Sequence, residues 1–203
     1  MGRTLNAVRP FLCAGALLAL GFARVGPVTA DHGAAAHTPE QRVSHRSAGW
    51  PIGPFTLSDQ RGGAFTQERL QGRWTFVLLG DTHCVQACGA ALSALAGLTQ
   101  RIARTDAVKT TQVLFVSLDP DRDTPQRLRE YLTAFDSGFV GATGSRQALE
   151  QLADEIGATG AAAASYRGSL VLIGPDGVVR VEYLPPFDTK RLTAEYLKTR
   201  ARG

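Results

Sequence analysis

Residues 74–88 read WTFVLLGDTHCVQAC, an apolar run followed by a polar turn and two cysteines. The run from Trp74 to Leu79 is too short for a stable helix and rich in strand formers, so it predicts a central strand buried on both faces. Cys84 and Cys88 come directly after it, where a parallel sheet presents its carboxyl ends and a helix begins. This stretch therefore predicts an α/β core and the place of its chemistry.

The segments on either side complete a strand–helix–strand unit. Residues 91–104 carry apolar side chains at helical spacing, and residues 112–118 repeat the apolar pattern of the first strand. A crossover of this kind joins parallel strands. Upstream, residues 54–63 alternate apolar and polar side chains before a turn, which predicts a short hairpin with Phe65 and Leu70 packed beneath it.

The C-terminal half predicts more helices and a second hairpin. Thr124 and Pro125 mark a helix start, and the turn Gly-Pro-Asp-Gly at 174–177 marks a hairpin. Elements are expected, in order, at helix 125–135, helix 145–156, strand 169–173, strand 178–183 and helix 188–200. The expected fold is α/β, a thioredoxin-like plan with a mixed β-sheet flanked by helices.

The first 48 residues predict a leader and a linker. Two arginines precede an apolar run at 11–23, and small residues follow it, so residues 1–30 are expected to be a signal peptide. The run is shorter than the ~20 residues that span a bilayer, which favours removal over an uncleaved anchor. Residues 31–48 contain hardly any large apolar group and are expected to be a flexible linker before a domain at 49–203.

The positive net charge depends on this leader. The whole chain carries a formal charge of +4, but residues 1–30 hold three arginines and no acidic group, so removal leaves 19 basic and 18 acidic residues. The basic residues that remain are scattered, and no face combines aromatic with basic residues. We therefore expect no nucleic-acid partner.

Two cysteines four residues apart suit three kinds of site. Cys13 lies in the leader, so export to an oxidising compartment leaves Cys84 and Cys88 as a structural disulfide, a redox dithiol or a soft-metal site. At this spacing both sulfurs lie on one side of a helical turn, near enough to bond each other or to hold one ion. Helix-start amides and a protonated His83 favour thiolates, which select Cu(I) among biological metals.

Three motifs carry a family resemblance that runs from about residue 53 to residue 197. They are FTLSDQ at 55–60, THCVQAC at 82–88 and SLDPDRDTP at 117–125. With them the chain resembles the Sco/SenC family, copper-handling thioredoxin-fold proteins that assist assembly of the copper centre of cytochrome c oxidase. The resemblance implies copper, as Cu(I), held by Cys84 and Cys88, and a copper-accepting oxidase subunit or another thiol or copper protein as partner.

The chain departs from this family at the third copper ligand. The family places a histidine eleven residues before the last glycine of the late hairpin; counting back from Gly177 gives Tyr166, and no histidine follows His83. A phenol at neutral pH is a poor copper ligand. Thiol–disulfide reductases of this fold usually place a cis-proline before the late core strand, where this chain has Gly168 and Ser169.

Three functions stay open. The first is an exported accessory protein that binds or transfers Cu(I) through Cys84 and Cys88, with a further ligand from a partner, a small molecule or the linker histidines His32, His37 and His45. The second is a thiol–disulfide oxidoreductase using the same pair. The third is a diverged binding or scaffold module without metal. An export signal with this resemblance suits a bacterial periplasm, with membrane association if the N-terminal segment stays uncleaved.

Overall fold

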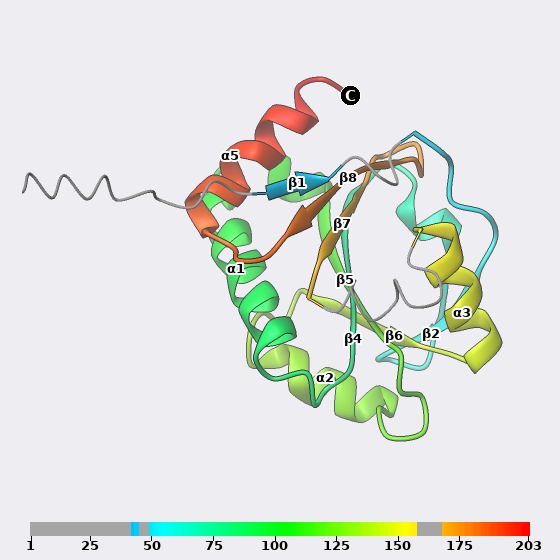
Figure 1. Ribbon diagram of the computed structural model, residues 1–203. Coiled ribbons are helices and arrows are strands. Elements are labelled where there is room, and N and C mark those ends of the chain that lie inside the picture. The colour runs from blue at the N-terminus through cyan, green and yellow to red at the C-terminus, as the bar shows by residue number, and fades with distance from the viewer. Residues whose placement is uncertain (1–41, 45–48, 158–167) are drawn as a thin grey trace, which may run out of the picture. The chain divides into compact units, whose positions relative to one another are not determined.

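The computed structural model describes residues 42–44, 49–157 and 168–203 (Figure 1). The strands in this part of the chain are β1 (Arg42–Ser44), β2 (Thr56–Asp59), β3 (Ala64–Thr66), β4 (Trp74–Gly80), β5 (Thr111–Ser117), β6 (Val140–Thr143), β7 (Leu170–Ile173) and β8 (Val179–Leu184). The helices are α1 (Ala87–Ile102), α2 (Pro125–Thr133), α3 (Arg146–Glu155) and α5 (Thr189–Arg200), with 3-10 turns at Gln67–Leu70 and Asp106–Thr110.

The strands form one mixed sheet in the order β1-β8-β7-β4-β5-β6-β2-β3. β4, β5 and β6 run parallel, while β7 pairs antiparallel with the other side of β4. All seven residues of β4 are buried, as the apolar run predicts. The late hairpin pairs β7 with β8 antiparallel, and the early hairpin pairs β2 with β3. The expected mixed sheet flanked by helices is confirmed.

Two apolar cores cover the two faces of this sheet. Alternate residues of β4 divide between them, because successive side chains of a strand point to opposite faces: Phe76 and Leu78 join one core, Val77 and Leu79 the other. Helices α1, α2 and α5 pack on the first face, and α3 packs on the second (Figure 1). The carboxyl ends of β4 and β5 therefore lie between helix layers, where the cysteines follow.

The structure adds two strands that the sequence pattern does not predict. β6 lies beside β5 at Val140–Thr143, where a glycine and an alanine weaken the strand signal. β1 lies at Arg42–Ser44, inside the range expected to be a linker, and pairs with β8. The linker expectation is corrected at these three residues, because an edge strand pairs through backbone groups and needs no apolar composition.

The helices follow the expected ranges with one instructive shift. The Thr124 side chain caps α2 by accepting a hydrogen bond from the Arg127 amide at 3.2 Å. α1, however, begins at Ala87, four residues before the range 91–104 expected from the apolar pattern. Its first turn holds small residues and no capping side chain, so the periodic signal starts late. Cys88 consequently belongs to the helix itself.

Several predictions from the sequence concern residues outside the described ranges. These include the signal peptide or anchor at 1–30, the position Tyr166 and the linker histidines His32, His37 and His45. Among the helices of residues 49–157 and 168–203, none combines the length and apolar character needed to cross a bilayer.

Candidate metal and redox site

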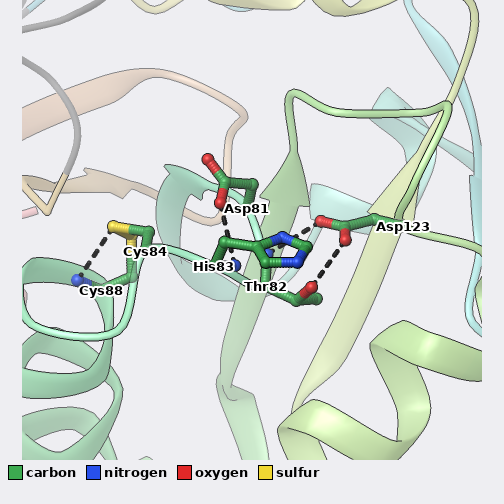
Figure 2. Close-up of a disulfide and its surroundings, with 6 residues drawn as sticks. All are labelled: Asp81, Thr82, His83, Cys84, Cys88 and Asp123. Carbon is green, nitrogen blue, oxygen red and sulfur yellow. Dashed lines mark hydrogen bonds between the residues drawn. A yellow bond between two sulfur atoms is a disulfide. The ribbon is translucent and has the colours of Figure 1, made fainter.

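Cys84 and Cys88 are joined by a disulfide at the start of α1 (Figure 2). Their Cα atoms lie 5.3 Å apart. Cys84 belongs to the loop after β4, and Cys88 to the first turn of α1. The proximity of the two sulfurs expected from their spacing is therefore confirmed, while their roles as metal ligands or redox groups remain predictions.

The two sulfurs differ in their access to solvent. Cys88 is fully buried in the core beneath α1, whereas Cys84 is half-buried. Between them the loop is exposed, and the Val85 side chain is 72% accessible. An incoming thiol or a metal-carrying partner therefore meets Cys84 first.

One backbone amide points at the accessible sulfur. The Cys88 N–H donates to Cys84 Sγ at 3.2 Å (Figure 2). Free amides and the positive end of the helix dipole stabilise negative charge at a helix start. Once the disulfide is reduced, this arrangement favours the thiolate of Cys84.

A tight turn connects β4 to Cys84. The Asp81 carboxylate accepts a hydrogen bond from the His83 amide at 2.9 Å, and the Asp81 carbonyl accepts one from the Cys84 amide at 3.1 Å. Aspartate favours such turns because its side chain reaches the amide two residues on. Cys84 is thus held by a turn as well as by its disulfide.

A buried carboxylate from the third motif holds the same turn. Asp123 has no exposed surface, and it accepts hydrogen bonds from the Thr82 amide at 2.9 Å and the Thr82 hydroxyl at 2.7 Å (Figure 2). The Ser117 hydroxyl donates to it at 2.6 Å. The helix start expected at Thr124 and Pro125 is confirmed, because Thr124 caps α2, and the neighbouring Asp123 holds the turn instead. The SLDPDRDTP motif is the only sequence signal of this contact.

Two ion pairs involve acidic residues of the loop that carries Asp123. Arg122 pairs with Asp119, and Arg146 pairs with Asp121. The hydrogen bond from Arg122, helped by the charges of Arg122 and His83, holds the pKa of Asp119 below its ordinary value.

His83 does not accompany the cysteines as a donor. Figure 2 shows its ring between Asp81 and Asp123, directed away from the two sulfurs. Among the residues that the structure describes, no three His, Cys, Asp or Glu side chains are grouped as a metal site requires. Within this part of the chain, the predicted metal ligands are still Cys84 and Cys88.

A family comparison connects this geometry with known proteins. The SCO1/SenC family model matches residues 44–201, which include the cysteine loop and the Asp123 motif. The chain belongs to the SCO1/SenC family. The Sco/SenC resemblance of the three motifs is thereby confirmed.

Individual relatives of this SCO1/SenC chain come from bacteria and mitochondria. A protein of Stutzerimonas stutzeri named "Putative copper-binding protein" is 34% identical over 137 residues, covering 64% of this chain and 67% of that protein. "Protein SCO1 homolog 1, mitochondrial" of Arabidopsis thaliana is 37% identical over 101 residues, covering 50% of this chain and 30% of that protein. The chain spans about a third of the length of the mitochondrial relatives it matches.

Solved SCO1/SenC structures have the same architecture. Arabidopsis thaliana ScoI, crystallised with copper bound, has a TM-score of 0.66 at 27% identity, covering 76% of this chain and 100% of that one. Yeast Sco1 with copper bound has a TM-score of 0.65 at 26% identity, covering 74% and 93%. The expected thioredoxin-like fold is confirmed.

This SCO1/SenC chain also differs from ordinary reductases of its fold at Gly168. Gly168 has a φ of +84°, and a Cβ there would lie 2.8 Å from the Cβ of Ala87 in the cysteine loop. The backbone before β7 therefore packs directly on the loop, and a side chain is excluded. Within the described ranges the cis peptide bond is Pro185–Pro186, and Gly168 and Ser169 stand directly before β7, where the sequence places them.

A tyrosine hydroxyl lies in the negative environment of this SCO1/SenC site. The Tyr131 hydroxyl is buried and makes no hydrogen bond within the part of the chain described. Burial first, and then the charges of Asp81 and Asp123, raise the pKa of Tyr131 above its ordinary value. The phenol therefore stays protonated and contributes no charge to the site.

Proposed function

We propose that this chain binds Cu(I) through reduced Cys84 and Cys88 and passes it to a copper-accepting protein during assembly of the copper centre of cytochrome c oxidase. The observation that carries the proposal is the pair itself: two sulfurs within bonding reach at a helix start, one of them facing an amide donor. Membership of a family whose relatives were solved with copper bound supports the same metal.

Metal binding requires the reduced pair. A thiol reductant supplies two electrons and two protons, the S–S bond breaks, and two thiols form while the reductant becomes a disulfide. Cu(I) then replaces the two thiol protons and is held by two thiolates, the soft ligands that it prefers. The copper keeps its oxidation state throughout this step.

The coordination proposed here uses two protein thiolates. The family's histidine position is Tyr166, and the ring of His83 is directed away from the sulfurs. Because Cys84 is accessible, a partner or a small molecule can supply the third donor at the loop surface. A two-thiolate site with an open side also suits release of the ion to an acceptor.

Cu(I) titration of the full chain tests the proposal. The reduced protein is titrated anaerobically against a competing Cu(I) chelator, beside a variant with both cysteines changed to Ser. We expect one Cu(I) per chain, and no competitive binding by the variant. If the native chain fails to compete, or if the double variant binds equally well, copper handling by this pair is refuted.

The burial asymmetry of the pair favours a second candidate function, thiol–disulfide exchange. The accessible Cys84 thiolate attacks a target disulfide and releases one target thiol; the buried Cys88 then displaces the second, leaving the chain oxidised and the target reduced by two electrons. A dithiol donor must reduce the chain again. Turnover of a disulfide substrate with such a donor, lost in Cys84→Ser, would favour this function over copper transfer.

Export is the proposed setting for either function. We place the mature domain in a bacterial periplasm, with residues 1–30 removed or retained as an anchor. Cell fractionation and N-terminal sequencing of the purified protein distinguish the two forms. A cytoplasmic protein with its first residues intact would overturn this placement.

A further inference from the structure

We infer that Asp123 is a positioning residue for the cysteine pair. Its buried carboxylate holds Thr82 and so keeps Cys84 beside Cys88 whether or not the disulfide is formed. This inference rests on the proposed use of the two sulfurs. It adds a residue 35 positions away from Cys88 to the site.

The contacts of Asp123 join the carboxyl ends of two neighbouring strands. Ser117 is the last residue of β5, and it lies opposite Gly80, the last residue of β4. The Ser117 hydroxyl and both donors of Thr82 converge on the one carboxylate, at 2.6, 2.9 and 2.7 Å. The first residues of the cysteine loop are thus attached to the neighbouring strand as well as to their own.

These contacts are buried. Asp123 and Ser117 have no exposed surface, and Thr82 is 5% exposed. A buried charge is costly unless hydrogen bonds satisfy it, and hydrogen bonds to charged groups are among the strong ones. If one of these hydrogen bonds breaks, a buried polar group is left without its partner. This cost opposes local opening of the turn.

Little chain separates this anchor from the sulfur. Thr82 lies two residues before Cys84, and the turn between them is closed by the Asp81 hydrogen bonds to the His83 and Cys84 amides. The Arg127 side chain adds a longer contact, from Nε to the Thr82 hydroxyl at 3.3 Å. Fixing Thr82 therefore limits where Cys84 can lie after the S–S bond is broken.

Disulfide formation and Cu(I) binding depend on this placement in the same way. Each closes a ring through the two sulfurs, so each gains from holding them near one another beforehand. Weakening the contact between Asp123 and Thr82 therefore lowers the equilibrium constants of disulfide formation and of Cu(I) binding together. A general loss of stability has no such paired effect on the folded protein.

The test compares four variants of the full chain. Asp123→Asn removes the charge and turns an amide toward the donors; Thr82→Val removes the hydroxyl and leaves the charge. Thr82→Ser keeps the hydroxyl and is the conservative rescue. Asp121→Asn is the matched control, the same change in the same loop at an exposed residue paired with Arg146.

Two measurements are made on each variant that folds, as judged by circular dichroism. The first is the equilibrium of the chain with glutathione, in which the reduced chain and glutathione disulfide give the oxidised chain and two glutathione thiols. The second is Cu(I) affinity against a competing chelator. The glutathione equilibrium needs no copper, so it decides the role of Asp123 even if the native chain binds no Cu(I) and the proposed function fails.

We expect Asp123→Asn and Thr82→Val to lower both constants in parallel, by about tenfold, as the loss of one buried hydrogen bond implies. Thr82→Ser and Asp121→Asn should stay near native. The inference is overturned if folded Thr82→Val keeps native constants, or if Asp121→Asn shifts them equally. Should Asp123→Asn not fold, Thr82→Val alone decides.

Discussion

Gly80 lies against the sulfur of Cys88: a Cβ at position 80 would fall 2.5 Å from that Sγ and 3.2 Å from the ring of Phe115. The last residue of β4 is therefore small because the buried half of the disulfide occupies the space beside it. Strand, aromatic core and cysteine are packed as one unit at this point.

This contact predicts that Gly80→Ala destabilises the protein. The added methyl must displace the Cys88 sulfur or the Phe115 ring, and overpacking of this kind costs about 1–3 kcal/mol. Gly89→Ala is the matched control, because a Cβ there meets nothing within 4 Å in α1. That change should stabilise by about 0.5–1 kcal/mol, since alanine suits a helix better than glycine. Urea unfolding of both variants checks the pair; equal effects would contradict the packing argument.

The two cysteines should differ when replaced one at a time. Cys84→Ser removes the disulfide, which closes a small loop and contributes about 2 kcal/mol. Cys88→Ser removes the same bond and also buries a hydroxyl in an apolar core, which costs about 1–3 kcal/mol more. Unfolding in urea under oxidising conditions measures the difference. Equal stabilities of the two variants would show that the environments of the sulfurs are alike.

Asp59 should make the early hairpin sensitive to acid. It is buried, which by itself raises its pKa, but hydrogen bonds from Arg69 and from the Arg61 and Gly63 amides outweigh burial and hold the pKa below the ordinary value of 3.8. A lowered pKa stabilises the fold at pH values above 3.8, and this stabilisation is lost as the pH falls through the folded-state value. Stability should therefore decline below about pH 4.

The corresponding variant is Asp59→Asn, which should weaken this decline. Asp106→Asn is its control, because that carboxylate is exposed and pairs with Lys109 on the surface. Urea unfolding from pH 2 to pH 7 gives, for each variant, the slope of the free energy of unfolding against pH. If both variants keep the native slope, Asp59 does not carry the acid sensitivity.

Tyr166→His should strengthen copper binding. The family resemblance places a histidine ligand at this position, and imidazole is a far better copper ligand than a protonated phenol. Cu(I) competition and the absorption spectrum with Cu(II) measure the gain, with Tyr166→Phe as the control that removes only the hydroxyl. No gain over the Phe variant would mean that the counted position does not face the sulfurs.

The central elements were predictable from sequence because their signals are local. β4 and β5 are apolar runs, and α2 carries its own cap and proline. β6 was not predictable from sequence, and its packing gives the reason. A Cβ at Gly141 would lie 2.7 Å from Leu132 of α2, so the strand needs a residue that strand propensity disfavours.

The candidate site was predictable only in part. Cys84 and Cys88 follow from spacing and position, because a helix start after a buried strand is a local pattern. The contact between Thr82 and Asp123 joins residues 41 positions apart, and no periodicity encodes it. Capping acts over only three residues, so the local signal at 123–125 indicates a helix start and not a contact with a distant turn.

β4 pairs with a strand on each side, so opening of the sheet and movement of the cysteine loop are separate motions. Thr75 to Leu78 are hydrogen-bonded to β5 on one side and β7 on the other, so their amides exchange with solvent only when the whole sheet opens. The loop that carries Cys84 begins beyond the last of these pairs, and its residues from His83 to Gln86 are exposed or half-buried. The proposed oxidised, reduced and copper-bound forms can therefore interchange many times during the lifetime of one folded molecule.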